Sequence, residues 1–147
     1  MKIIVDADGC PVTKIAVKLA KKNKLKCILV SDFNHQLKDA YAEIIAVDKG
    51  IDAADFKILS LLTKGDVLVT QDYGLASLAL PKGCFVINQN GFFYDEDNID
   101  QLLLTRHISK QMRKSGQRSK GPSKRKKEDD VLFEDKLKEF LNKQFQK

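Results

Sequence analysis

The chain opens with the stretch that decides its fold, IIVDADGCP at residues 3–11. Its first three residues are apolar and β-branched, which predicts a short buried strand that ends at Asp6. Asp8 can face the same way as Asp6 if the chain stays extended. Gly9 permits a sharp turn, and Pro11 predicts the first position of a following helix. A strand, an acidic turn and a helix therefore follow one another within the first 20 residues.

This alternation continues along the whole chain. Apolar runs predict further strands at 27–30, 44–47, 67–70 and 85–87, and helical spacing predicts helices at 37–41, 52–62, 75–80, 98–112 and 131–145. Within the helix at 52–62, apolar residues recur at helical spacing at Ala53, Phe56, Leu59 and Leu62, which predicts one apolar face. Since the strands are continuous apolar runs, we expect a mainly parallel sheet covered on both faces. The prediction is a three-layer α/β fold with helices on both faces and an amphipathic C-terminal helix.

Composition excludes several classes of protein. The chain has 147 residues, of which 43% are hydrophobic, so it is long enough for one core and too apolar for wholesale disorder. No apolar run approaches the roughly 20 residues of a membrane span, and acidic residues come too early for a signal peptide, so a cytoplasmic protein with no membrane partner is expected. Three widely spaced cysteines and two histidines argue against a zinc site or a disulfide framework.

The charge is distributed unevenly. The net charge of +6 combines a mildly acidic body with ten Lys and Arg residues, and no acid, between residues 106 and 127. We therefore predict three parts: an α/β domain at 1–114, a basic loop rich in Gly, Ser and Lys at 115–127, and a helix at 128–147 packed on the same domain. A basic block of this kind is typical of contacts with RNA or another polyanion. The predicted nucleic-acid-binding residues are Arg106, Lys110, Arg113, Lys114, Arg118, Lys120, Lys124, Arg125, Lys126 and Lys127.

The candidate site consists of five aspartates. Asp6 and Asp72 follow predicted strands, so they fall at the carboxyl edge of the sheet where ligands bind in α/β folds. Asp52 and Asp55 are three residues apart at a helix start and can share one face. A structural alternative is that Asp52, Asp72 or Asp8 merely caps a helix. Capping leaves Asp6 unexplained, and a cap can also be a ligand.

Crowded carboxylates indicate a cation. Like charges raise one another's pKa and resist desolvation, so a chain that gathers them usually neutralises them. The cation suited to a few carboxylate ligands and several waters is Mg²⁺ or Mn²⁺. The predicted metal ligands are Asp6, Asp8, Asp52, Asp55 and Asp72, the predicted catalytic carboxylates are Asp6, Asp8, Asp55 and Asp72, and Thr70 is expected to support them through its hydroxyl.

Several motifs together resemble a known family. The segments IIVDADGCPV, GIDAADFKIL and GDVLVTQDYGLA, the later NQNG at 88–91 followed by Tyr94, and the SG…GP element at residues 115–122 are similar to the YaiI/YqxD family of uncharacterised bacterial proteins. The resemblance covers about residues 3–142. That family is grouped with the PIN-like nuclease superfamily, which implies a PIN-like parallel sheet and an acidic pocket for a divalent metal. The matching positions are Asp6, Asp52, Asp55 and Asp72, whereas Asp8 belongs to the narrower family.

Three functions are open at this point. The first is a metal-dependent phosphodiesterase or ribonuclease. The second is a non-catalytic module that binds RNA or a protein and keeps the acids as helix caps. The third is a phosphatase of the haloacid-dehalogenase type, because VDADGC resembles that family's opening motif, with Asp6 as the covalent nucleophile and Asp8 as the general acid. Against the third, Cys10 stands where a threonine is expected, and the chain is short.

Overall fold

The computed structural model describes residues 1–32, 37–48, 50, 52–116 and 124–145. In chain order the elements are β1 (Lys2–Asp6), α1 (Thr13–Lys22), β2 (Lys26–Asp32), β3 (Glu43–Val47), α2 (Ala53–Leu61), β4 (Val67–Val69), α3 (Tyr73–Ala79), the 3-10 helix η1 (Leu80–Lys82), β5 (Phe85–Ile87), β6 (Phe93–Tyr94), α4 (Glu96–Lys114) and α5 (Lys127–Phe145). The strands form one six-stranded sheet in the order β3-β2-β1-β4-β5-β6. All neighbouring pairs are parallel except β5 and β6.

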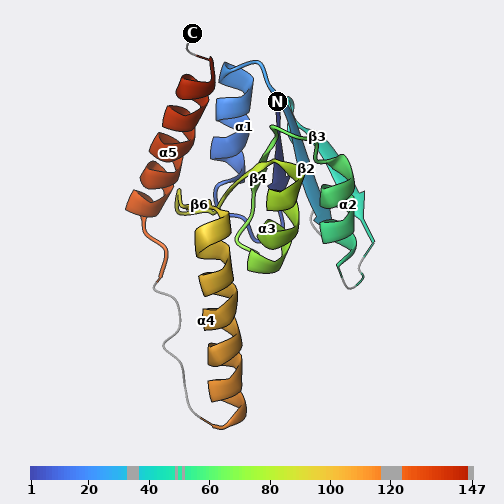
Figure 1. The fold of residues 1–147 in the computed structure, drawn as a ribbon. Helices are drawn as coiled ribbons and strands as arrows, with labels where there is room; N and C mark the ends of the chain where they lie inside the picture. The colour runs from blue at the N-terminus through green and yellow to red at the C-terminus, as the bar shows by residue number, and fades with distance from the viewer. Residues whose placement is uncertain (33–36, 49, 51, 117–123, 146–147) are drawn as a thin grey trace.

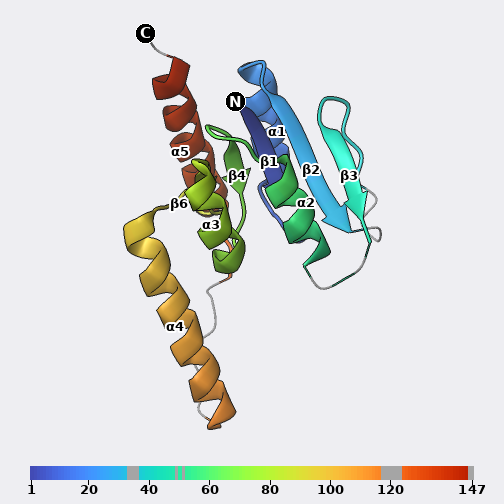
Figure 2. The same ribbon diagram turned by 45° about the vertical axis from the view of Figure 1, so that its right-hand side comes forward.

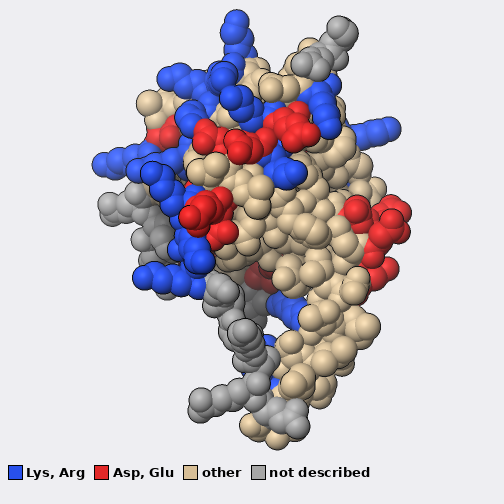
Figure 3. Space-filling model, turned by 90° about the vertical axis from the view of Figure 1, so that its left-hand side faces the viewer, with Lys and Arg blue, Asp and Glu red and all other residues tan. Residues whose placement is uncertain are grey.

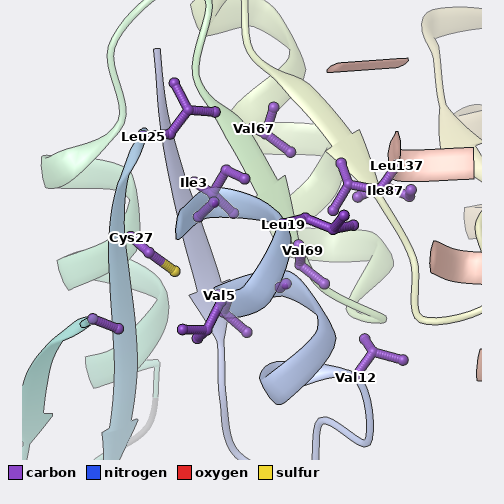
Figure 4. Packing of buried hydrophobic residues seen from close by; sticks show 14 of the residues in the cluster. Ile3, Val5, Val12, Leu19, Leu25, Cys27, Val67, Val69, Ile87 and Leu137 are labelled. Carbon is purple, nitrogen blue, oxygen red and sulfur yellow. The ribbon is translucent and has the colours of Figure 1, made fainter. Parts of the chain in front are cut away.

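The sheet is the middle layer of three, as the sequence predicts (Figures 1 and 2). On one face, Ile3 and Val5 of β1 pack with residues of α1 and with Leu137 of α5 (Figure 4). On the other face, Ile4 packs with Ile58 of α2 and with residues of α3 and α4. Strand residues that alternate in direction but are all apolar fill both layers. The three-layer α/β prediction is confirmed.

The C-terminal helix α5 is part of the main core. Phe133, Leu137 and Leu141 are fully buried in the same cluster as α1 and β1. Where α5 passes the loop between β5 and β6, Gly91 has φ +85°, and a Cβ there would meet the Leu132 carbonyl oxygen at 3.0 Å. Only glycine fits this close approach without strain.

Some predicted elements differ from the structure. Residues 37–42 form no helix, because the Asp39 carboxylate accepts hydrogen bonds from the backbone amides of Tyr41 and Ala42 at 2.8 and 2.7 Å, which fixes a turn instead. Helix α1 begins at Thr13 rather than at Pro11, which lies in the preceding turn. The edge strand β6 is only two residues long, too short for sequence periodicity to predict. None of the helices in the described ranges combines the length and the apolar composition needed to cross a bilayer.

The packing of α5 gives a first testable prediction. We expect Phe133→Ala to lower the free energy of unfolding by about 3–5 kcal/mol, because a fully buried phenylalanine leaves a cavity between α5 and α1. Leu132→Ala, at an exposed neighbouring position, is the control and should change it by less than about 0.5 kcal/mol. Urea denaturation followed by circular dichroism measures both. Equal effects of the two variants would contradict a docked α5.

Candidate functional site

An acidic pocket lies where the chain reverses its direction across the sheet. From β1 the chain proceeds outward to β2 and β3, and then returns to β4 on the other side of β1. In open α/β sheets, ligands bind outside the carboxyl ends of the strands at such a point. A cavity of about 330 Å³ lies there, at the lower ends of β1 and β4 in Figure 1. It is lined by Asp6, Asp8, Cys10, Gly50, Asp52, Ala53, Ala54, Asp55, Val69, Thr70, Gln71, Asp72 and Gln89.

Asp6 is a half-buried carboxylate of the pocket, at the end of β1. Its Oδ2 accepts a hydrogen bond of 2.9 Å from the Thr70 hydroxyl, the supporting role expected for that residue. The pKa of Asp6 is raised from 3.8 to about 6, mainly by burial; the Thr70 hydrogen bond lowers it, and the nearby charges of Asp55, Asp72 and Asp8 raise it. Within the described residues, no Lys or Arg forms an ion pair with Asp6. The site therefore holds a carboxylate at a cost in folding free energy.

Two other aspartates face the same space from helix starts. The Asp72 Oδ1 accepts hydrogen bonds from the amides of Gly74 and Leu75 at 2.8 and 3.2 Å, so this residue does cap α3. Its backbone amide donates to the Thr70 hydroxyl, which ties it to Asp6 through one shared group. Burial raises the pKa of Asp55, with contributions from Asp72 and Asp52. Asp72 therefore caps α3 and also belongs to the group of aspartates around the pocket.

Asp52 does not behave as the capping alternative requires. It occupies the N-cap position of α2, yet its side chain makes no capping hydrogen bond. Its backbone has φ +63°, a left-handed conformation that is uncommon for residues other than glycine. The turn therefore presents the Asp52 side chain at the pocket wall, and capping does not explain its identity.

Asp8 lies at the border between the pocket and β2. Its two carboxylate oxygens are 3.1 and 3.3 Å from the backbone amide of Asp32, the last residue of β2. This contact holds the acidic turn after β1 against the end of the neighbouring strand. All five predicted aspartates and Thr70 therefore lie around one cavity.

A buried aspartate at the opposite edge of the sheet shows what a structural acid looks like in this fold. Asp66, just before β4, pairs with the Lys2 ammonium at 2.5 Å and also accepts from the amide and hydroxyl of Thr63. Burial raises the pKa of Asp66, but these hydrogen bonds outweigh it and leave the pKa below 3.8. Asp66 is neutralised within the protein, whereas Asp6 is not.

The carboxylates of the pocket suit a hard cation that keeps several water ligands, but they do not form a complete set of metal ligands by themselves. Among the described residues, no three His, Cys, Asp or Glu side chains stand close enough together to hold a metal ion by themselves. Carboxylate oxygens around a cavity of about 330 Å³ do match Mg²⁺, which keeps several waters and takes one or two protein carboxylates. One or two of the carboxylates of Asp6, Asp55 and Asp72, together with waters, would hold such an ion.

Four predicted basic residues form one face of α4. Leu102 and Leu103 pack against the core beside α3, and positions three and four residues further on lie on the same side of a helix. That side is lined by Arg106, Lys110, Arg113 and Lys114 where α4 extends beyond the sheet (Figures 1 and 2). Seen from the side shown in Figure 3, the projecting half of α4 presents mainly uncharged residues. The basic face begins at the pocket, because an Arg106 guanidinium nitrogen lies 3.8 Å from an Asp72 carboxylate oxygen.

The remaining basic residues differ in their surroundings. Arg125 is engaged within the protein: its guanidinium donates to Asp130, to the Asn90 side chain and to the Gln89 carbonyl, at 2.8, 2.6 and 2.8 Å. It therefore ties the start of α5 to the loop that forms one wall of the pocket. Lys124, Lys126 and Lys127 are exposed nearby. Arg118 and Lys120 lie outside the described residues, as does the Gly-Pro pair of the family motif.

Sequence reasoning missed parts of the lining. Gln89 follows β5 at the carboxyl edge, so the strand-end argument that identified Asp6 and Asp72 applies to it equally. Gln71 lies between two predicted site residues. Cys10 also lines the pocket, but burial raises the pKa of its thiol, which disfavours the thiolate that a nucleophile needs.

The chain belongs to the family described as "Uncharacterized BCR, YaiI/YqxD family", whose model matches residues 4–143. Among its relatives are UPF0178 proteins of Alkaliphilus oremlandii, 47% identical over 97% of this chain and 92% of the relative, and of Oceanobacillus iheyensis, 47% identical over 97% and 100%. A UPF0178 protein of Bacillus cereus strain AH187 is 47% identical over 96% and 99%. No solved structure matches the chain. The resemblance seen in the sequence motifs is confirmed at the level of this family.

The raised pKa of Asp6 has a measurable consequence for stability. Because the folded state holds the proton up to about pH 6 and the unfolded chain only to about 3.8, stability should fall as the pH rises between these values. Asp6→Asn keeps an acceptor for Thr70 and removes the charge. We expect it to gain about 1–3 kcal/mol relative to the wild type between pH 4 and pH 8, measured by urea denaturation.

Asp66→Asn serves as the control with the opposite sign. Its lowered pKa means that ionised Asp66 stabilises the fold above pH 3.8, so this variant should lose stability at pH 7 and lose less in acid. If Asp6→Asn instead tracks the wild type at every pH, Asp6 is not the uncompensated charge described above.

Proposed function

We propose that this protein hydrolyses phosphodiester bonds of nucleic acid, with Mg²⁺ or Mn²⁺ bound at the aspartate pocket. The observation that carries the proposal is the contrast between two acids. Asp6 is crowded by other acids and has no cationic partner among the residues that the structure describes, whereas Asp66 is neutralised by Lys2. Evolving or retaining such a site is costly unless a ligand neutralises it. The resemblance to the YaiI/YqxD family implies a grouping with the PIN-like nucleases, and this analogy supports the same chemistry.

Each residue of the pocket has a defined part in this proposal. Asp6, with Asp55 or Asp72, would hold the cation together with water ligands, and the Thr70 hydroxyl orients the Asp6 carboxylate by the 2.9 Å hydrogen bond. A cation held there would supply Lewis-acid activation of a water and would stabilise charge that develops on phosphate oxygens. Arg106, at the mouth of the pocket, binds a phosphate group that approaches along α4. Asp8 and Asp52 add negative charge at the rim.

One observation favours a second candidate function, a binding module without turnover. No three carboxylates of the described residues stand within reach of one ion, and Asp72 has a capping role of its own. In that case the basic face of α4 would bind a polyanion, and the acids would serve structure alone. The two candidates differ in whether a divalent cation binds and whether a substrate is cleaved.

Cation binding is the first property to measure. We expect isothermal calorimetry with Mn²⁺ to show saturable binding to the wild type and at least about tenfold weaker binding to Asp6→Asn and Asp72→Asn, because each loses one anionic ligand. Glu139→Gln, an exposed acid on α5 outside the pocket, removes the same charge and should bind like the wild type. Identical titrations for all four proteins would refute a shared site at Asp6 and Asp72.

The pH dependence of this binding follows from Asp6. A cation must displace the proton that Asp6 holds below about pH 6, so the Mn²⁺ affinity should be about tenfold weaker at pH 5 than at pH 7.5. Calorimetry in buffers of different ionisation enthalpy also counts the released proton. An affinity that is flat over this range would argue that Asp6 is not a ligand.

Turnover is tested with labelled single-stranded RNA and DNA in Mn²⁺ or Mg²⁺. We expect cleavage by the wild type and by Glu139→Gln, and a loss of at least about 100-fold for Asp6→Asn, in view of the charge stabilisation that the cation supplies. Far-UV circular dichroism establishes that each variant is folded. Cation binding without cleavage of either polymer would favour the binding module.

A further inference from the structure

An aromatic side chain lies exposed beside the acidic pocket. Phe56, expected on the apolar face of α2, is 70% exposed, and Leu78 of α3 is 58% exposed. With Leu59, they line a groove of about 510 Å³ between α2 and α3. The groove shares Asp52, Asp55 and Asp72 with the acidic pocket, and Arg106 lies at its edge. The apolar floor of the groove therefore lies beside a cluster of aspartates and beside the Arg106 guanidinium.

The packing of α2 against the sheet leaves Phe56 outside the core. Ile58 is fully buried in the core on the α2 face of the sheet, and Leu62 is nearly so, while Phe56 lies on the other side of the helix beside Asp55. Single exposed apolar side chains are ordinary on protein surfaces, so it is the groove shared by Phe56, Leu59 and Leu78, rimmed by polar residues, that indicates a binding site. Phe56 also follows Asp55, a predicted metal ligand, so its apolar side chain lies beside the acidic pocket.

We infer that this groove binds a nucleobase of a single-stranded nucleic acid, with the base stacked on Phe56 and its phosphate on Arg106, at the start of the basic face of α4. The inference rests on the proposed function and names the form of its substrate. A nucleotide combines a flat apolar face with an anionic group, which matches Phe56 and Leu78 on one side and Arg106 on the other. Bases in a duplex are stacked on each other, so only an unpaired base offers its face.

Charge along α4 supports the same occupant. The basic face from Arg106 to Lys114 continues from the edge of the groove and lines a second hollow. Eight residues of helix span about 12 Å, enough for at least one further phosphate of an extended strand. A strand that places one base on Phe56 can thus continue along α4 while its phosphates meet Arg106, Lys110 and Lys114.

Fluorescence anisotropy with a short labelled single-stranded oligoribonucleotide, in EDTA, tests this binding without catalysis. We expect Phe56→Ala to bind about tenfold more weakly and Phe56→Trp to retain wild-type affinity, because stacking needs only an aromatic face. Phe145→Ala, which removes a phenylalanine that is 51% exposed at the end of α5, is the matched control and should leave affinity unchanged. Lys110→Ala should reduce the slope of log affinity against log salt by about 0.7.

Three results would overturn the inference. One is equal affinity of Phe56→Ala and the wild type, and another is binding of the same sequence as a duplex as tightly as the single strand. The third is self-association of the wild type in sedimentation velocity that Phe56→Ala abolishes, since the groove would then be covered by a second copy of the chain.

The inference and the proposed function fail in different experiments. If binding in EDTA depends on Phe56 but no cleavage occurs in Mn²⁺, nucleobase binding in the groove is supported and hydrolysis is refuted. Cleavage by Phe56→Ala with unchanged KM and kcat retains hydrolysis and refutes the groove. A raised KM with an unchanged kcat supports the groove as a part of substrate binding.

Discussion

The structure depends on β1 being enclosed on every side. Its neighbours β2 and β4 pair with it along both edges, and Ile3, Ile4 and Val5 are fully buried between the two helical layers. A strand in this position has no freedom to shift its register, because a slip by one residue would exchange its two faces. Its last residue, Asp6, is consequently fixed in a partly desolvated place at the carboxyl edge. The acidic pocket is thus a direct result of where the core ends.

At this edge of the sheet, the arrangement of acids that would bind a cation lowers the stability of the fold. Removing water from Asp6 and surrounding it with Asp8, Asp55 and Asp72 disfavours the charged form that a cation requires. The fold offsets this loss of stability only in part, through the Thr70 hydroxyl and the helix N-terminus capped by Asp72. A bound cation would remove the remaining repulsion, and the folded protein would become more stable through mass action.

How much of the structure was predictable depended on the range of the interactions involved. The layers, the parallel sheet and the meeting of Asp6 with Asp72 follow from apolar runs and from the geometry of strand ends, which are local in sequence. The turn at Asp39 was missed because a single side chain captures two amides that helical spacing would assign to a helix. The exposure of Phe56 and the internal contacts of Arg125 arise from tertiary neighbours, and no pattern within α2 or the basic segment specifies them.

The contacts of Arg125 also constrain the order in which the molecule is built. Residues 124–145 supply Phe133, Leu137 and Leu141 to a core that begins at Ile3, and Arg125 holds the loop that carries Gln89. Chain emerging from the ribosome cannot form these contacts until residues 124–145 have been made. The core contacts of α5 with β1 join segments more than 100 residues apart, and those of Arg125 reach back 35 and 36 residues. Until then the face of the sheet beneath α5 is uncovered, and one wall of the acidic pocket is not fixed. A nascent chain, held next to the message being translated, would therefore lack the finished pocket.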